Sequence, residues 1–489
     1  MTPSLFKLLR GVLLAVSLGS ALTACATAPG TGRTIFTGGL TEEQESEMGR
    51  QQHPQILKQF GGAYDDPALA RYVTSVGERL AATSERKDIH YTFTVIDSPI
   101  VNAFALPGGY VYVTRGLLAL ARNEAELAGV LAHEIGHITA RHAAERYGQN
   151  LATTIASAGL GILGGSAAAS AGQSLGAVAL SSYSRDQEFE SDTLGVRYLS
   201  RAGYKTSAMA DFLGQLLANS RLDAEIAGQP GAADQFSLLQ THPKTADRVE
   251  RAVEAAQVQA NNESDVRQAV YQRHIDGIVY GDNPSQGVIK RRRFLHPDLR
   301  FAFEVPEGFE LINAPQLVIG RGPGDAVILF SRAPEPYSGS MTRYLTDVWG
   351  KKATLRDVES LEIDGMKAAT ASTRADTDVG LRDIRVIAIR YDENTVYRFL
   401  YATPPNQTAR YNEAFRRSSY SFEKLSAAEA AEITPLRIGL HKVQPGETVE
   451  TIAAGMPLVD RGAERLMVLN GLDSPAELKP GMTIKVITG

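Results

Sequence analysis

The spacing of apolar residues along the first half of the chain predicts a mainly helical domain. A helix is predicted after Asp66, where apolar residues recur at helical intervals, at Leu69, Tyr72, Val73, Val76 and Leu80. Apolar and polar residues instead alternate over 89–97, which is typical of a half-buried strand, and residues 110–114 are predicted to form a second strand. We therefore expect residues 41–285 to form a mainly α-helical domain with a small β-sheet.

The second half of the chain has a strand-rich pattern that begins after a linker of turn residues at 282–287. Strands are predicted at 301–305, 317–319, 326–330, 358–363, 367–372, 384–391 and 395–401. Two helical stretches interrupt them, near 341–350 and 412–418. We expect an α+β domain over residues 290–427, in which no spacing of His, Asp, Glu or Ser indicates a chemical role.

The C-terminal residues follow a third pattern, in which a strand, two helices and a strand succeed one another. Turn residues separate these elements at Gln444-Pro445-Gly446-Glu447, Asn470-Gly471 and Leu478-Lys479-Pro480-Gly481. The pattern resembles LysM modules, although Met456-Pro457 and an insertion at Asp460-Arg461-Gly462 depart from the usual short helix-loop-helix. The resemblance implies a βααβ fold over residues 438–488 and binding of glycans that contain N-acetylglucosamine, such as peptidoglycan.

Length and composition indicate a multidomain globular protein. The chain has 489 residues, more than one ordinary domain holds, and its 43% hydrophobic and 21% charged residues are near the globular average. Fifty Lys and Arg against 55 Asp and Glu give a net charge of −5, without the basic stripe typical of nucleic-acid binding. We therefore expect no nucleic-acid partner. A single cysteine excludes an intramolecular disulfide.

The first residues of the chain have the features of a secretory signal. Lys7 and Arg10 precede an apolar stretch at 11–21, which is short for a permanent membrane anchor. The stretch ends in Leu22-Thr23-Ala24-Cys25, which contains the only cysteine of the chain and resembles a bacterial lipobox. The resemblance implies that residues 1–24 are a lipoprotein signal peptide.

The same resemblance implies that Cys25 becomes the lipidated first residue of the mature protein. Because Ala26 rather than Asp follows it, the implied destination is the periplasmic face of the bacterial outer membrane. Residues 25–40, rich in Thr, Gly and Ala, are predicted to form a flexible tether.

A stretch of 38 residues, 147–184, contains no charged residue. Of these, 23 are Gly, Ala or Ser and only eight are Leu, Ile or Val, too few for a spanning helix of about 20 mainly apolar residues. We expect small-residue helices and loops packed beside their neighbours, or a mobile apolar lid, rather than membrane insertion.

A zinc-binding motif is predicted on a helix that begins at Asn123, which has Glu126 three residues later. In His133-Glu134-Ile135-Gly136-His137, the two imidazoles lie about 40° apart around the helix and about 6 Å along it, so both can bind one ion. Zinc accepts such a pair without a geometric demand of its own. Glu134 can then act as the general base of amide hydrolysis, and an edge strand predicted at 100–106 can pair with an extended substrate.

One other zinc pattern is excluded by the residues that follow the motif. A histidine ten residues after His133 would indicate a metzincin, but this position is Ala143. His142, one residue earlier, is misplaced for that role and is expected to be structural.

A catalytic zinc needs a third protein ligand, and an acidic helical segment supplies candidates. Glu188 is a better candidate for the third ligand than Glu190. Asp192, four residues later on the same helix face, can accept a hydrogen bond from a ligating histidine. Glu190 points about 200° away from Glu188 and is the weaker candidate.

These motifs together resemble those of the BepA/HtpX-like gluzincin metallopeptidases, relatives of the CAAX prenyl proteases. The resemblance is carried by residues 123–137 and by Ser184-Arg185 with Glu188-x-x-x-Asp192, and it extends over residues 41–285. It is closest to the periplasmic branch. It implies zinc-dependent endopeptidase activity with one Zn²⁺ per chain, ligands His133, His137 and Glu188, and Glu134 as catalytic base.

In that branch a further histidine, in a Thr-His-Pro segment, can approach the zinc and hold the enzyme latent. The segment here is Thr241-His242-Pro243, with Arg248 following. From the residues alone, His242 is equally compatible with an oxyanion-side donor and with a plain residue at the start of a helix.

We therefore predict a lipid-anchored zinc endopeptidase that hydrolyses misfolded or stalled proteins of the cell envelope. Its partners would be unfolded or misassembled envelope polypeptides, the membrane and, through residues 438–488, peptidoglycan. The alternative is a non-proteolytic chaperone or wall-binding scaffold with a latent zinc site, but Glu134 beside an open coordination position favours the enzyme. The tetratricopeptide array of BepA-type members is replaced here by the α+β and LysM-like parts, so client recognition is expected to differ.

Overall fold

The computed structural model describes residues 25–159, 182–228, 242, 245–258, 266–458 and 460–489. The chain divides into two compact units. The first contains the residues up to Leu57, Gly62–Ile278 and Arg437–Thr488, and the second is mainly Val279–Leu436. The predicted signal peptide and the centre of the uncharged stretch 147–184 lie outside the described residues.

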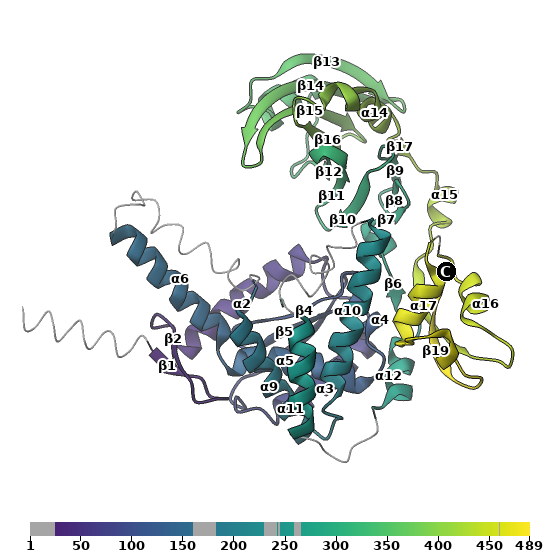
Figure 1. Cartoon of the computed structure of the whole chain (residues 1–489). Coiled ribbons are helices and arrows are strands. Elements are labelled where there is room, and N and C mark those ends of the chain that lie inside the picture. The colour runs from purple at the N-terminus through teal and green to yellow at the C-terminus, as the bar shows by residue number, and fades with distance from the viewer. Residues whose placement is uncertain (1–24, 160–181, 229–241, 243–244, 259–265, 459) are drawn as a thin grey trace, which may run out of the picture. The chain divides into compact units, whose positions relative to one another are not determined.

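The first unit is built around helices (Figure 1), and several of them begin at a side-chain cap. The Asp66 side chain accepts hydrogen bonds from the first-turn amides of α3, and Asn123 accepts one from the Glu126 amide in α5. Ser184 and Gln187 form a capping box at the start of α9. The helices of this unit are α2 (Glu42–Gln59), α3 (Pro67–Ala81), α4 (Arg115–Leu120), α5 (Glu124–Thr139), α6 (His142–Gly159), α9 (Arg185–Arg201), α10 (Ala208–Ile226), α11 (Thr245–Val258) and α12 (Gln268–Ile275).

A small sheet lies against these helices, in the strand order β3-β5-β4. Strand β3 (Thr92–Ile96) is parallel to β5 (Tyr110–Thr114), and β4 (Ala103–Leu106) is antiparallel to β5. Strand β4 therefore forms one edge of the sheet, with all four of its residues buried.

Helices α5 and α9 approach each other closely because glycines lie where they meet. A Cβ at Gly136 would lie 2.9 Å from the carbonyl oxygen of Ser191, and one at Gly195 would lie 3.1 Å from the backbone nitrogen of His133. The Ser191 hydroxyl donates a hydrogen bond to the carbonyl of His133 at 2.5 Å. This close packing places the side chains at the start of α9 within reach of those on α5.

The N-terminal residues differ from the flexible tether that their composition predicts. Strands β1 (Cys25–Thr27) and β2 (Thr34–Phe36) pair in antiparallel register, and Ala28 and Ile35 are buried. A Cβ at Gly30 would lie 2.9 Å from the Leu194 side chain of α9, so this glycine serves close packing. The small side chains of these residues permit close packing against a helix where one is near, and chain flexibility where none is.

Residues 437–488 pack onto the helices of the first unit and have the expected strand–helix–helix–strand order. Strands β18 (Leu436–Lys442) and β19 (Thr483–Thr488) are antiparallel, and α16 (Val449–Ala454) and α17 (Gly462–Asn470) lie between them in sequence. The buried ammonium of Lys485 donates hydrogen bonds to three carbonyls at the end of α4, those of Ala119, Leu120 and Ala121. Arg465 of α17 binds Asn219 and Asp223 of α10.

The second unit contains two antiparallel sheets, as the strand-rich pattern predicts. A seven-stranded sheet has the order β10-β11-β12-β16-β15-β14-β13, and a four-stranded sheet has the order β17-β9-β8-β7. The strands of these two sheets are β7 (Val288–Lys290), β8 (Arg293–His296), β9 (Phe301–Glu304), β10 (Glu310–Ala314), β11 (Leu317–Gly322), β12 (Ala326–Arg332), β13 (Arg356–Ile363), β14 (Met366–Thr377), β15 (Gly380–Arg390), β16 (Val396–Thr403) and β17 (Glu423–Lys424). Strand β6 (Val279–Tyr280) belongs to neither of them.

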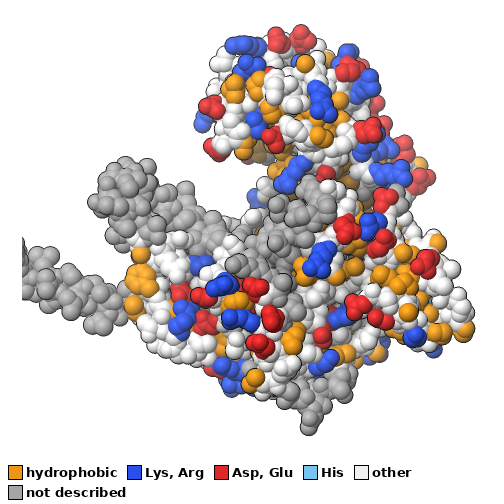
Figure 2. All heavy atoms as spheres, in the orientation of Figure 1, with side chains coloured by type: hydrophobic (Ala, Val, Ile, Leu, Met, Phe, Trp, Pro, Cys, Tyr) orange, Lys and Arg blue, Asp and Glu red, His pale blue; other side chains and the backbone are white. Residues whose placement is uncertain are grey.

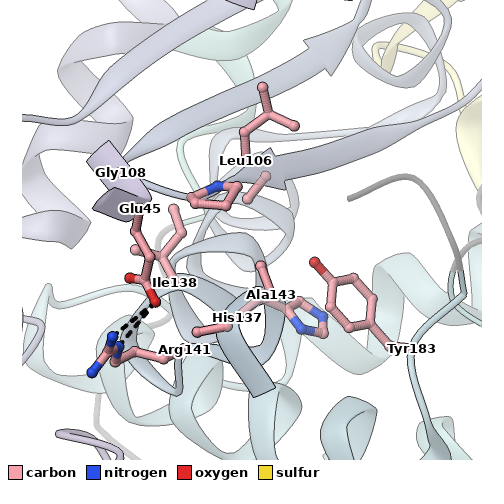
Figure 3. A pocket seen from close by; sticks show the side chains of 11 residues that line it. Glu45, Leu106, Gly108, His137, Ile138, Arg141, Ala143 and Tyr183 are labelled. Atoms are coloured by element: carbon pink, nitrogen blue, oxygen red, sulfur yellow. Dashed lines mark hydrogen bonds and ion pairs between the residues drawn. The ribbon is translucent and has the colours of Figure 1, made fainter. Parts of the chain in front are cut away.

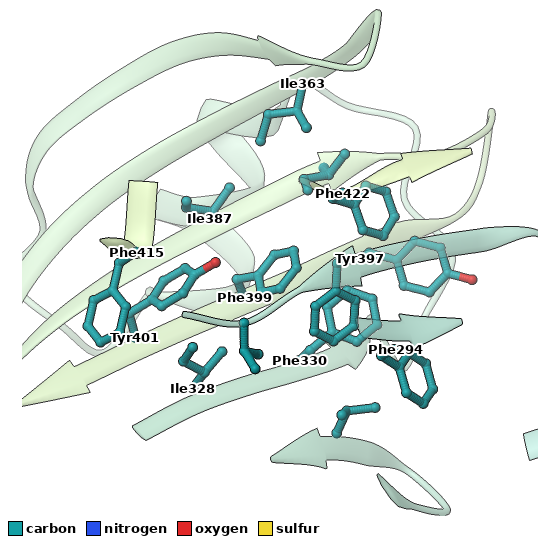
Figure 4. Packing of buried hydrophobic residues seen from close by; sticks show 14 of the residues in the cluster. Phe294, Ile328, Phe330, Ile363, Ile387, Tyr397, Phe399, Tyr401, Phe415 and Phe422 are labelled. Atoms are coloured by element: carbon teal, nitrogen blue, oxygen red, sulfur yellow. The ribbon is translucent and has the colours of Figure 1, made fainter. Parts of the chain in front are cut away.

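Aromatic side chains fill the core of the second unit. Figure 4 shows the rings of Phe330, Tyr397, Phe399 and Phe422 gathered in this core. The hairpin between β13 and β14 turns at Asp364 and Gly365, both with positive φ, as the Asp-Gly turn predicts. The helices of this unit are α13 (Met341–Arg343), a π-helix (Tyr344–Trp349), α14 (Thr408–Tyr420) and α15 (Ala427–Ala431).

Two further properties concern the surface and the membrane. Acidic and basic side chains are intermingled on the face shown in Figure 2, in line with the near balance of charges in the sequence. Within the described part of the chain, no helix combines the length and the apolar character needed to cross a membrane.

Candidate metal centre and active site

Helices α5 and α9 and the segment before α11 bring four potential metal ligands together. One ligand atom from each lies within 4.8 Å of the others: His133, His137, Glu188 and His242. The Nε2 atoms of His133 and His137 are 3.0 Å apart, and Nδ1 of His242 is 3.3 Å from Nε2 of His133. Glu188 Oε1 lies 3.5 Å from His137 Nε2 and 2.8 Å from His242 Nδ1. All four side chains are buried.

Glu134 approaches the same centre from α5. Its Oε1 is 3.6 Å from Nε2 of His242, and neither of its carboxylate oxygens has a hydrogen-bond partner among the described residues. Burial raises the pKa of the Glu134 carboxyl above its ordinary value. A carboxyl with a raised pKa can hold a proton between accepting it and delivering it, as a general base must.

A buried arginine supports the two acidic residues of α9. Arg248, on α11, is 2.7 Å from Glu188 Oε2 and contacts the two Asp192 oxygens at 2.7 and 2.8 Å. Burial would raise both carboxyl pKa values, but the charge of Arg248 holds the pKa of Glu188 well below its ordinary value and lowers that of Asp192. Both carboxyl groups are therefore ionised.

Asp192 also orients the first histidine of the motif. Nδ1 of His133 lies 2.8 Å from Asp192 Oδ1, so the imidazole N–H donates to the carboxylate and Nε2 faces the centre. On the other histidine, burial lowers the pKa of His137 well below its ordinary value. The His137 ring is therefore neutral and keeps a lone pair available for a metal.

This donor set fits a zinc ion. Zinc binds histidine nitrogen and carboxylate oxygen in a tetrahedral arrangement, and three protein ligands leave one position open. Nε2 of His242 and both oxygens of Glu134 are buried without hydrogen-bond partners in the described part of the chain, which fits a cation bound beside them. His133, His137 and Glu188 would hold the ion, and His242 lies where a fourth ligand can bind.

A cavity beside His137 opens against the end of the edge strand β4 (Figure 3). Its apolar lining includes Leu106 and Ile138, and the ion pair of Glu45 with Arg141, 3.0 Å, lies at its margin. The ring of Tyr183 stacks on His137 with centroids 3.7 Å apart. The cavity thus lies between the edge strand and the candidate metal centre.

The structure brings together the residues that the sequence favours as ligands, base or auxiliaries: His133, Glu134, His137, Glu188, Asp192 and His242. The lipidation candidate Cys25 is exposed on β1. Glu190 is outside the cluster and binds His142 and Arg33 instead.

Sequence reasoning did not assign the roles of three residues that contact the ligands. His142, expected to be only structural, lies with Nδ1 2.7 Å from Nδ1 of His137. Arg248 follows the Thr-His-Pro segment, but its local sequence does not distinguish it from an arginine on the surface. Tyr183 lies at the end of the uncharged stretch, where the sequence gives no signal for a ring against a ligand.

Comparisons with known proteins agree with this geometry. Residues 67–256 match the family described as Peptidase family M48, and residues 441–486 match the LysM domain. The chain is 29% identical over 257 residues to the beta-barrel assembly-enhancing protease of Escherichia coli, covering 50% of each chain. It is 32% identical over 226 residues to the protein of that name from Yersinia pestis, covering 44% of each.

A eukaryotic relative matches the same region. The mitochondrial metalloendopeptidase OMA1 of Schizosaccharomyces pombe is 32% identical over 218 residues, which cover 43% of this chain and 60% of that protein. The chain thus spans about half the length of the bacterial relatives that it matches. The chain is thus similar to peptidase family M48 over residues 67–256 and to LysM domains over residues 441–486.

Proposed function

We propose that this chain is a zinc-dependent metalloendopeptidase of the bacterial cell envelope. The observation that carries the proposal is the buried group of His133, His137, Glu188 and His242, with the Glu134 carboxylate beside it, which has no hydrogen-bond partner among the described residues. A structural zinc site has no need of a base next to an open coordination position. The M48 domain match and the relatives named as proteases support the same activity.

Each residue of the group has a role in amide hydrolysis. Zinc held by His133, His137 and Glu188 would supply Lewis acidity to the attacking water and the scissile carbonyl. Glu134 takes the proton of the water and delivers it to the leaving amine. The edge strand β4 pairs with the extended substrate backbone, and the cavity beside His137 receives a substrate side chain.

His242 supports a latent resting state. It lies within the ligand group and is 1% exposed, so it excludes water from the position in which the reaction takes place. Departure of His242 would open this position. His242 itself lies in neither α10 nor α11, so its displacement from the ligand group does not require either helix to unfold.

The substrates proposed are misfolded or stalled polypeptides of the envelope. The bacterial relatives are named for enhancing beta-barrel assembly, and an extended, unfolded chain is what an edge strand accepts. Lipidation of Cys25 would hold the enzyme at the periplasmic face of the outer membrane. The LysM domain supports a second attachment, to peptidoglycan.

The LysM domain also favours a second candidate function, a wall-binding scaffold without proteolysis. A pair of variants separates the two. Wild type and Glu134→Gln, each also combined with His242→Ala to remove latency, are incubated with casein, and zinc content is measured in all four. We expect about one zinc per chain throughout, with cleavage only where Glu134 is intact and only until a chelator is added. Equal cleavage with Glu134→Gln, or none in any variant despite bound zinc, would favour the scaffold.

A further inference from the structure

A second histidine contacts His137 at Nδ1, the ring nitrogen on the side away from the candidate metal centre. His142 is fully buried, and its Nδ1 lies 2.7 Å from Nδ1 of His137. The two residues are placed by a sharp turn between α5 and α6, where Arg141 adopts a positive φ of 56°. The turn brings the first residue of α6 back against the last turn of α5.

The second nitrogen of His142 faces a carboxylate. Its Nε2 lies 3.2 Å from Oε2 of Glu190 on α9. A carboxylate accepts only, so Nε2 of His142 carries the proton and Nδ1 is left as an acceptor. That acceptor takes the N–H of His137 Nδ1, which leaves the Nε2 lone pair of His137 directed at the metal centre. Each step of this chain therefore has one donor and one acceptor.

The N-terminal hairpin holds Glu190 in place. Thr31 donates to Glu190 Oε1 at 2.5 Å, and Nε of Arg33 donates to Oε2 at 3.0 Å. The two remaining guanidinium nitrogens of Arg33 bind both oxygens of Glu145 on α6, at 2.6 and 2.8 Å. Arg33 therefore joins α6 to α9 across the hairpin that follows Cys25.

We propose that His142 and Glu190 are positioning residues for the metal ligand His137, and that Thr31 and Arg33 of the N-terminal hairpin complete this support. The proposal rests on the proposed function, since it assigns His137 to a bound zinc. By this proposal, the segment that follows Cys25 helps to support the metal centre. His133 has the corresponding support on its own side, from Asp192 and Arg248.

The test measures metal affinity in the full chain without any substrate. Zn²⁺ and Co²⁺ are titrated into metal-free wild type, His142→Phe, Glu190→Gln and Arg33→Gln, and the visible absorption of bound Co²⁺ reports the ligand geometry. Arg201→Gln is the matched control, because Arg201 is 47% exposed against 40% for Arg33 and pairs with Glu85 away from the site. Thermal unfolding of each metal-free variant reports whether it is folded.

We expect His142→Phe and Glu190→Gln to bind metal about 10–100-fold more weakly than wild type, with an altered Co²⁺ spectrum. Arg33→Gln should show a smaller loss, and Arg201→Gln none. Wild-type affinity and spectrum in folded Glu190→Gln and Arg33→Gln would overturn the proposal, even if His142→Phe did not fold. If the affinities fall as expected while wild type and His242→Ala cleave nothing, the proposed function fails and the positioning role stands.

Discussion

Replacement of Arg248 by methionine should destabilise the first unit strongly. Arg248 is 3% exposed and makes contacts of 2.7–2.8 Å with Glu188 and Asp192, which are themselves buried. Methionine preserves much of the volume but leaves two ionised carboxylates without their cation. Removing one partner of a buried ion pair costs about 3–5 kcal/mol. We therefore expect a loss of this size in the free energy of unfolding of the metal-free protein.

Two spectroscopic signals distinguish unfolding of the first unit from unfolding of the second. Its single tryptophan, Trp349, packs in the second unit, whereas most long helices lie in the first. Urea unfolding followed by circular dichroism at 222 nm therefore reports mainly the first unit, and tryptophan fluorescence reports the second. At a denaturant dependence of roughly 3 kcal/mol per molar, the expected loss lowers the first midpoint by about 1 M or more.

The control is Arg201→Met, which removes an exposed pair with Glu85 in the same unit. Exposed pairs contribute about 0–1 kcal/mol, so its midpoint should stay close to that of wild type. Arg248→Lys, which keeps the charge but loses the forked contact with Asp192, should fall between the two. A dichroism midpoint for Arg248→Met no lower than that of Arg201→Met would refute the reasoning, as would an equal shift of the fluorescence transition.

Three further outcomes follow from the candidate site. Glu188→Ala should lose most of its zinc by metal analysis, whereas Glu190→Ala should keep about one zinc per chain when zinc is in excess; equal retention would remove Glu188 from the ligand set. His242→Ala should raise basal cleavage of casein at unchanged zinc content, because it clears the fourth position. A fall of about 10²-fold would instead assign His242 to oxyanion stabilisation. Cys25→Ser should move the protein from the membrane to the soluble fraction on cell fractionation, and persistence in the membrane after signal cleavage would point to residues 147–184.

The parts of the site that lie on one helix follow from local sequence. The period of an α-helix places His133 and His137 on one face without reference to the rest of the fold, and the Asn123 cap fixes where that helix begins. The same period relates Glu188 to Asp192 on α9. In the second unit, the strand pattern located six of the seven strands of the large sheet, with ends within about five residues, but it missed β10.

The supports that reach the site from elsewhere in the chain have no such local signal. Arg248 binds Asp192 from 56 residues away, and Arg33 binds Glu190 from 157 residues away. Each arginine looks like a surface residue in its own segment, because a buried charge is distinguished only by the partner that it meets. Such pairings depend on which helices pack together, and helical periodicity does not specify that.

The glycines explain why the composition of residues 25–40 predicted a tether and the structure has a packed hairpin. A run rich in Gly and Thr has low side-chain volume, which permits flexibility when nothing is near and close approach when a partner is present. Gly30 lies against Leu194 of α9, and Gly136 lies against Ser191 of the same helix. The approach at Gly136 brings Glu188 to the two histidines, and the approach at Gly30 brings Arg33 to Glu190. Small residues thus govern the separation of α5, α9 and the N-terminal hairpin, so alanine at either glycine should disturb metal binding without changing any ligand.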